Sequence, residues 1–200
     1  MKIIGINGSP HRQGDTTLLL QTALDAAESA GAETEIFLVT EILKKLKSPF
    51  CSACANPCPA TCYRGTIMDD ILEKIGGADG LLVGSPVYFG EISGQLKSFW
   101  DRTRRLRTEK KLINVVGGAL SVGAARFGGQ ETTLQAIHNM MLVQGMIIVG
   151  DGLPDKDAGH FGAAAQHEAR KDEHSLKRAV ILGKRVATVA RATVELRSGR

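Results

Sequence analysis

The stretch KIIGINGSPHRQGDTTLLL, Lys2 to Leu20, decides the fold of this 200-residue chain. Its mostly apolar start, Lys2–Asn7, ends in a Gly-Ser-Pro turn, which is typical of a strand buried on both faces of a parallel sheet. From Asp15 onward, apolar residues recur at helical spacing until Gly31, a residue type that often ends helices. A buried strand followed by a loop and a helix is the repeating unit of α/β proteins.

The remainder of the chain repeats this unit. Four further strand-like runs are expected at residues 34–40, 80–86, 111–118 and 146–150. Helical patterns separate them, and the closing helix is expected within residues 172–196. Five strands alternating with helices predict an α/β fold with a parallel sheet and right-handed crossovers. We expect one domain over residues 1–200, with a cysteine-rich insertion at about residues 45–66.

Composition narrows the range of functions. The hydrophobic content of 43% and the charged content of 23% are those of a soluble globular protein. No run of about 18 apolar residues exists, so no membrane span is expected, and the N-terminus lacks a signal-peptide pattern. The net charge of +4 includes the basic run Asp101–Lys111. Because no nucleic-acid recognition motif accompanies that run, we interpret it as a solvated helix end and expect a cytoplasmic protein without a nucleic-acid partner.

In open parallel sheets, ligands bind beyond the carboxyl ends of the strands. The first loop there, Gly8–Thr17, joins a strand to a helix N-terminus, where backbone N–H groups and the helix dipole favour anions. Its side chains that suit a phosphate are Ser9, Thr16, Thr17, Arg12 and His11. The loop matches neither the P-loop nor the dinucleotide-binding fingerprint. An ordinary helix cap formed by Asp15 or Thr16 is the alternative.

Two later loops suit a flat ring. The second loop, Ser85–Lys97, places Tyr88 and Phe89 at a strand end, where they can contact a planar heterocycle or belong to the core or a subunit interface. The third, Gly117–Thr132, is rich in glycines that would leave backbone amides uncovered. Those glycines are Gly117, Gly118, Gly123, Gly128 and Gly129. Together the three loops indicate a ligand with a phosphate at one end and a flat polar ring at the other.

Three motifs resemble one known family. GINGSPHRQGDTTLLL (5–20), DGLLVGSPVYFGEISGQLKSFWDR (79–102) and VGAARFGGQETTL (122–134) are similar, in order and spacing, to the flavodoxin-like NADPH-dependent FMN reductases. The iron–sulfur flavoproteins within that family are the nearest match. The resemblance extends through LKRAVILGKRVATVA (176–190). It implies a flavodoxin-like three-layer sandwich with strand order 2-1-3-4-5 and noncovalently bound FMN.

The resemblance also implies roles for particular residues. The FMN phosphate would be held by Ser9, Arg12, Gly14, Thr16 and Thr17. One side of the ring would be flanked by Pro86, Val87, Tyr88, Phe89 and Gly90. The other side would be covered by Ser121, Arg126, Phe127, Gly128 and Gly129. No side chain is assigned as a catalytic acid or base, because the flavin performs the redox chemistry. The family further suggests a homodimer or homotetramer in which a neighbouring chain completes the flavin pocket.

All four cysteines lie within twelve consecutive positions, as Cys51, Cys54, Cys58 and Cys62. Disulfides are rare in the cytoplasm, so this C-x2-C-x3-C-x3-C segment indicates metal ligands or redox groups. A [4Fe–4S] cluster is held by four thiolates, which compact motifs place two or three residues apart so that one loop surrounds the cluster. A zinc site and thiols without metal remain open alternatives. The iron–sulfur flavoproteins carry a compact four-cysteine motif in this same connection, although the spacing here is wider at the third and fourth cysteines.

We therefore predict an FMN-dependent electron-transfer flavoprotein or oxidoreductase in which a [4Fe–4S] cluster passes electrons to or from FMN. Its electron donor would be ferredoxin or NAD(P)H. One alternative is an NAD(P)H-dependent FMN or quinone reductase without a cluster, and another is a non-enzymatic regulatory protein on the same scaffold. His160, His167 and His174 recur every seven residues, and we interpret them as exposed loop residues rather than a metal site.

Overall fold

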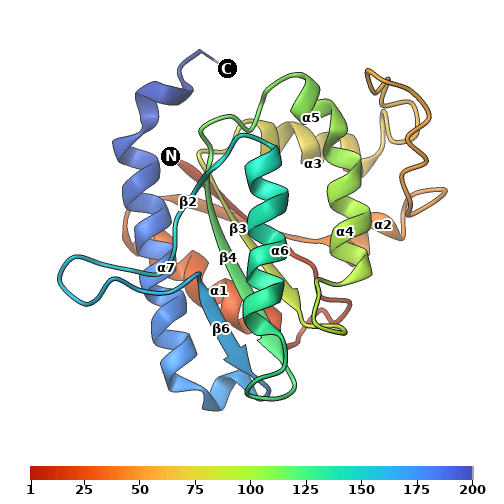
Figure 1. Ribbon diagram of the computed structural model, residues 1–200. Helices are drawn as coiled ribbons and strands as arrows, with labels where there is room; N and C mark the ends of the chain where they lie inside the picture. The colour runs from red at the N-terminus through yellow and green to blue at the C-terminus, as the bar shows by residue number, and fades with distance from the viewer. Residues whose placement is uncertain (200) are drawn as a thin grey trace.

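The computed structural model describes residues 1–199, which form a parallel sheet with helices on both faces (Figure 1). The strands are β1 (Lys2–Asn7), β2 (Glu33–Leu38), β3 (Gly80–Pro86), β4 (Val116–Gly123), β5 (Ile147–Ile148) and β6 (Ala163–Gln166). The helices are α1 (Asp15–Ser29), α2 (Val39–Leu43), α3 (Ile67–Gly76), α4 (Gly94–Trp100), α5 (Arg104–Thr108), α6 (Gln130–Val143) and α7 (Glu173–Ala192). Short 3-10 turns occupy Asp101–Thr103, Ala169–Lys171 and Val194–Arg197. The strand order β2-β1-β3-β4-β5 confirms the predicted flavodoxin-like topology.

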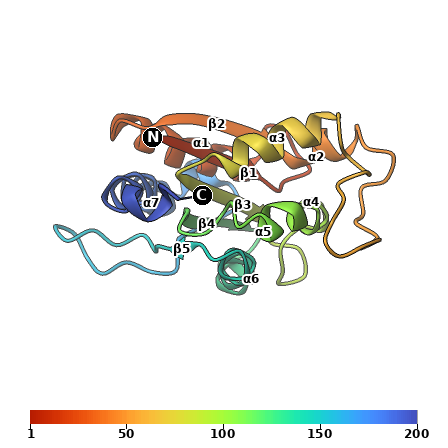
Figure 2. The ribbon, with the colours of Figure 1, turned by 90° about the horizontal axis from the view of Figure 1, so that it is seen from above.

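Two apolar cores lie on opposite faces of the sheet. Figure 2 shows from above the helices that cover each face. On one face, α1 and α7 pack against alternate strand residues such as Ile3 and Leu82. On the other face, α3, α4 and α6 pack against the intervening residues, such as Ile4 and Leu81. The strands are therefore apolar on both sides, which explains why their sequences are nearly continuous hydrophobic runs. The helices α1 and α7 approach closely at Gly183, where a Cβ would lie only 1.9 Å from the Ala23 carbonyl oxygen.

The predicted start of the fourth strand was wrong by five residues, because β4 begins at Val116 and not at Lys111. Residues 111–115 form turns, and Asn114 has a left-handed φ of 63°. Leu112 and Val115 are buried within these turns, so their apolar pattern resembles a strand.

The shift of β4 also places Gly117 and Gly118 inside the sheet rather than in a ligand-binding loop. A Cβ on Gly117 would lie 2.6 Å from the Met141 sulfur of α6. A Cβ on Gly118 would lie 2.9 Å from Val186 of α7. These two glycines therefore allow helices to pack closely on β4, and their amides belong to the strand.

The last position of the sheet is divided between two short strands. β5 pairs with the start of β4 and β6 pairs with its end, both in parallel register. Residues 149–162 lie between them and project away from the sheet, on the side opposite the cysteine segment (Figures 1 and 2). β6, Ala163–Gln166, is a sixth strand beyond the five that the sequence predicted.

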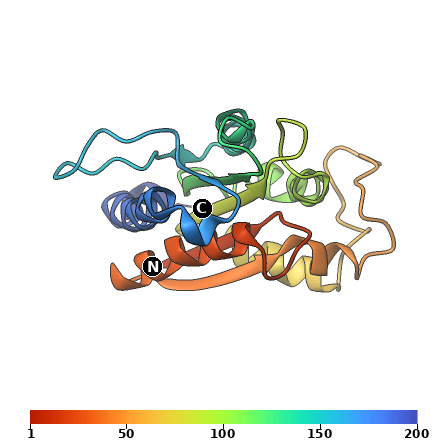
Figure 3. The same cartoon turned by 90° about the horizontal axis from the view of Figure 1, so that it is seen from below.

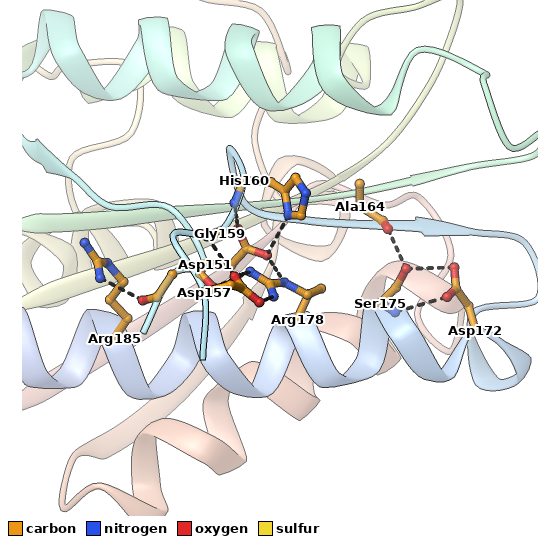
Figure 4. A network of polar contacts seen from close by, with 10 residues as sticks. Asp151, Asp157, Gly159, His160, Ala164, Asp172, Ser175, Arg178 and Arg185 are labelled. Atoms are coloured by element: carbon orange, nitrogen blue, oxygen red, sulfur yellow. Dashed lines mark hydrogen bonds and ion pairs between the residues drawn. The ribbon is translucent and has the colours of Figure 1, made fainter. Parts of the chain in front are cut away.

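An ion-pair network attaches this projecting segment to α7 (Figure 4). The guanidinium of Arg178 donates to the Asp151 carboxylate and binds both carboxylate oxygens of Asp157, at 2.9 and 3.0 Å. The second oxygen of Asp151 accepts from the backbone N–H of His160 at 2.5 Å. Asp151 is fully buried, so its carboxylate depends on the ion pair with Arg178 for compensation of its charge. Within residues 1–199, no helix combines the length and apolar content needed to cross a bilayer.

Candidate functional site

The carboxyl ends of β1, β3, β4 and β6 lie along one edge of the sheet, at the bottom of Figure 1 and facing the viewer in Figure 3. The loops that follow these strands are held to one another by hydrogen bonds. Gly8 N–H donates to the Gly84 carbonyl at 2.8 Å, and the Ser93 hydroxyl donates to the Gly8 carbonyl at 2.5 Å. These bonds join the loop after β1 to the loop after β3. The structure thus brings the first two predicted ligand loops together.

The loop after β1 is held by its own side chains. The Asn7 carboxamide accepts from the Ser9 N–H at 2.8 Å and donates to the Thr17 hydroxyl at 2.8 Å. The Thr17 hydroxyl in turn donates to the Arg12 carbonyl at 3.0 Å, and the Ser9 hydroxyl accepts from the His11 N–H at 3.1 Å. The hydroxyls of Ser9 and Thr17, both predicted phosphate ligands, therefore also fix the shape of the loop.

The N-terminus of α1 is open to an anion. Its N-cap is Gly14, so no side chain accepts from the first N–H groups of the helix. Thr16 is buried, and its methyl group faces Gly84 at the end of β3. The side chain of Arg12 is exposed, where it can reach a ligand on this loop. This helix start fits the terminal phosphate of FMN. The helix dipole is positive at its N-terminus, and the backbone N–H groups there can donate to phosphate oxygens because no side chain caps them.

The loop after β3 contains a tight turn that presents an aromatic residue to solvent. Tyr88 and Glu91 exchange backbone hydrogen bonds of 2.9 and 3.1 Å across the turn. The two central residues, Phe89 and Gly90, have left-handed φ values of 53° and 78°. Such a conformation is costly for a non-glycine residue, by about 1–2 kcal/mol. Phe89 is nevertheless fully exposed, and Tyr88 is partly exposed, so this strained turn keeps apolar surface at the sheet edge.

The loop after β4, residues 124–129, is held by Gln130. Its carboxamide accepts from the Gly128 N–H at 2.9 Å and donates to the Ala125 carbonyl at 2.6 Å. The buried hydroxyl of Ser121, a predicted ring-site residue, donates to the Gln130 carbonyl at 3.0 Å. Ser121 therefore holds the loop from beneath. Arg126 lies over the ring of Phe127 at 5.2 Å, and both side chains are exposed.

The loops after β3 and β4 touch at two glycines. Gly129 has a left-handed φ of 99°, and a Cβ at this position would lie 2.9 Å from the Gly90 Cα. The Thr132 hydroxyl also donates to the Gly90 carbonyl, at 2.7 Å. The predicted ring residues 86–90 and 126–129 thus lie on neighbouring loops, as a ring bound between them requires. Pro86 and Val87 are half-buried at the end of β3, where the Val87 N–H donates to the Val122 carbonyl at 2.8 Å.

A fourth segment, which follows β6, joins this edge. The His167 ring nitrogen Nδ1 lies 2.6 Å from an Asp15 carboxylate oxygen in the first turn of α1. The His167 N–H donates to the Gly123 carbonyl at 2.8 Å. A cavity of about 940 Å³ lies beside this segment. It is lined by Arg126, Phe127 and Gly129 together with residues from β6 and the start of α7, but not by residues 8–17 or 86–90.

The cysteine loop, residues 45–66, projects from the molecule beside α4 (Figures 1 and 2). None of its four thiols is in a disulfide, and all are at least partly exposed. Within residues 1–199, no three His, Cys, Asp or Glu side chains are close enough to bind one metal ion. The thiols are therefore available as ligands but are not gathered in this arrangement. The same finding applies to His160, His167 and His174.

Two buried polar residues, one next to the cysteine loop and one within it, were not identified from sequence. The guanidinium of Arg102 donates to backbone carbonyls of the loop and to the sulfur of Cys62. Tyr63 is buried, and its hydroxyl has no partner among the described residues. Desolvation by burial raises the pKa of Tyr63 to about 12, so the phenol stays protonated and can donate a hydrogen bond.

The signals for the missed residues differ. Asn7 and Gln130 lie within the motifs GINGSP and GGQET, so the sequence placed them beside two ligand loops. It did not show that their side chains hydrogen-bond to those loops. Arg102 lies in the basic run that was interpreted as a solvated helix end. For Arg102 that interpretation was wrong, because the side chain is buried.

Comparison with known proteins identifies relatives of the whole chain. The model of the NADPH-dependent FMN reductase family matches residues 1–157. An iron–sulfur flavoprotein of Methanocaldococcus jannaschii is 46% identical over 96% of this chain and 98% of its own length. An NAD(P)H dehydrogenase (quinone) of Archaeoglobus fulgidus is 32% identical over 88% of this chain and 92% of its own. Among solved structures, a WrbA-like flavodoxin of Agrobacterium tumefaciens superposes with a TM-score of 0.68 at 21% identity, covering 96% and 97% of the two chains.

Proposed function

The chain belongs to the NADPH-dependent FMN reductase family and is an FMN-dependent oxidoreductase, and we propose that it transfers electrons between FMN and a [4Fe–4S] cluster on the cysteine loop. The observation that carries the FMN site is the convergence of three loops at the carboxyl edge of the sheet. FMN supplies the chemistry, because a flavin accepts electrons in pairs and releases them singly. The chain's own residues bind and orient the flavin.

We assign the two ends of FMN to different loops. The phosphate binds at the glycine-capped start of α1, near Ser9, Arg12 and Thr16. The ring lies between residues 86–90 and 126–129. The glycine cap and the contact between Gly90 and Gly129 support this assignment. Exposed aromatic residues on both ring loops add apolar surface for the flavin or for a neighbouring chain.

The cluster is assigned to Cys51, Cys54, Cys58 and Cys62. Four unpaired thiols in twelve positions are the donor set of an iron–sulfur cluster, and the M. jannaschii relative bears the name iron–sulfur flavoprotein. Metal sites commonly form only when the metal binds, because the ligating segment folds around it. We infer that the cysteine loop closes in this way, bringing its separated thiols together.

The remaining partners follow from the same proposal. The electron donor is ferredoxin or NAD(P)H, and the protein is cytoplasmic, where reduced thiols persist. It assembles as a homodimer or homotetramer. The exposed side chains of Tyr88, Phe89 and Phe127 at the flavin edge support an assembly in which a second chain covers the ring.

A second candidate function is an NAD(P)H-dependent quinone reductase that uses FMN without a cluster. The separation of the four thiols favours it, as does the A. fulgidus relative named NAD(P)H dehydrogenase (quinone). In that case the cysteine loop would have no redox role.

Anaerobic purification followed by iron, sulfide and flavin assays on one sample separates these functions. The proposed function predicts roughly four iron and four sulfide per FMN. Replacing Cys54 by Ser should then lower the iron content and leave the FMN content unchanged. Wild-type protein that holds FMN but no iron would contradict the cluster and favour the quinone reductase. A single zinc ion per chain would also contradict the cluster.

A further inference from the structure

Arg102 follows directly after α4, in the 3-10 turn Asp101–Thr103. Its side chain is 2% exposed, so a permanent positive charge lies inside the protein. Within residues 1–199, no carboxylate forms an ion pair with it, unlike the buried Arg178, which has two. Buried charges in proteins are normally paired, because removing an ion from water is costly. Arg102 is therefore a buried cation that lacks a carboxylate partner, and an anion beside it would supply the missing negative charge.

The acceptors around Arg102 show where that anion lies. Nε donates to the Pro49 carbonyl at 3.2 Å, and Nη2 donates to the carbonyls of Phe50, at 2.9 Å, and Ser48. Nη1 donates to the sulfur of Cys62 at 3.1 Å. One guanidinium thus binds the beginning and the end of the cysteine loop. Among the described residues, the sulfur of Cys62 is the one contact of Arg102 that would carry negative charge when it ligates a metal.

We propose that Arg102 is the positioning residue of the metal site: it closes the cysteine loop and supplies the counter-charge to the thiolate-ligated cluster. This inference rests on the proposed cluster. By binding the carbonyls of 48–50 and the sulfur of Cys62 together, Arg102 shortens the distance that the loop must span to surround a metal. An N–H donated to a ligand sulfur also stabilises added negative charge, and hydrogen bonds to cluster sulfurs set the reduction potential.

Three variants separate the roles of Arg102. Arg102→Gln removes the charge, and Arg102→Lys keeps the charge but loses the multiple N–H donors. Arg107→Gln removes an exposed charge on α5, five residues further along the chain, as a matched control. Each variant is purified anaerobically with its FMN. Iron per FMN, the rate of iron release to a chelator and the midpoint potential of the cluster are measured.

We expect Arg102→Gln to lose more than half of its iron, to keep its FMN, and to shift the potential of the remaining cluster to more negative values. Arg102→Lys should release iron several-fold faster than wild type but keep a potential near the wild-type value. Arg107→Gln should match wild type in all three measurements. If Arg102→Gln does not fold, the iron-release rate of Arg102→Lys remains the deciding measurement.

Two results would overturn the inference, and they are distinguishable. Wild-type iron content and release rates in both Arg102 variants would show that Arg102 does not hold the loop, while leaving the cluster itself intact. Wild-type protein that binds FMN but no iron would instead overturn the proposed cluster, and the role of Arg102 with it.

Discussion

Replacing Gly129 by Ala should weaken FMN binding by changing the spacing of the two ring loops. A Cβ at this position would lie 2.9 Å from the Gly90 Cα, whereas carbon atoms in contact normally lie about 3.5–4.0 Å apart. The loops after β3 and β4 must therefore separate by roughly 0.6–1.1 Å. A movement of that size weakens one or two hydrogen bonds to a ring bound between them, each contributing about 0.5–1.5 kcal/mol.

The expected loss of about 1–2 kcal/mol corresponds to a rise in the FMN dissociation constant of roughly 5- to 30-fold. Quenching of flavin fluorescence on titration of the apoprotein measures this constant directly. The left-handed φ of Gly129 adds a separate cost of about 1–2 kcal/mol to the free energy of unfolding.

Gly65→Ala is the matched control for that backbone cost. Gly65 also has a left-handed φ, of 71°, but nothing lies within 4 Å of a Cβ built there. It should lose stability as Gly129→Ala does and bind FMN with the wild-type dissociation constant. If folded Gly129→Ala protein also bound FMN as wild type does, the ring would not depend on the spacing of these two loops, and the assignment would be refuted.

Two further predictions concern the attachment of α7. Replacing Arg178 by Met leaves the fully buried Asp151 carboxylate without its ion-pair partner, so urea denaturation should show a free energy of unfolding lower by about 3–5 kcal/mol. The control is Arg185→Met, which breaks one hydrogen bond to a backbone carbonyl. A loss no larger than that of the control would contradict the network. Desolvation raises the pKa of Asp172, but hydrogen bonds from Ser175 outweigh it and hold that pKa below its ordinary value of 3.8. Because the folded-state pKa is lowered, this stabilisation is complete above the unfolded-state pKa and is lost as the pH falls through the folded-state value. Asp172→Asn should therefore lose less unfolding free energy than wild type between about pH 5 and about pH 2, and equal losses would count against the prediction.

Much of the fold could be predicted from the sequence because its strands are buried on both faces. Continuous apolar runs such as Lys2–Asn7 indicate strands that are covered on both faces, and their alternation with helices indicates the α/β fold class. The errors arose where the hydrophobic pattern does not indicate the secondary structure. Residues 111–115 are apolar because they are buried in turns, whereas Ala163–Gln166 form a strand from residues with weak strand preference.

The candidate site divides in the same way. The three ligand loops could be located because strand ends and helix starts are local features of the sequence. The bonding within them could not, because the hydroxyls of Thr17 and Ser121 are used by the loops themselves. Arg102 shows the limit most clearly. In a run of cationic residues, the sequence cannot show which side chain folds inward to contact a loop forty to fifty-two positions earlier.

β5 and β6 share the last position of the sheet, and this arrangement has a consequence for variation in chain length. Both strands pair with β4 in the same direction, so residues added or removed at 154–156, outside the contacts of Leu153 and Asp157, need not alter the pairing on either side. The contacts of Asp151, Asp157 and His160 anchor both ends of this projecting segment, so that only its outermost residues are separate from the sheet and α7. The protein therefore contains a point where it can gain a new peptide, such as a tag or a recognition segment, while its flavin edge stays as it was.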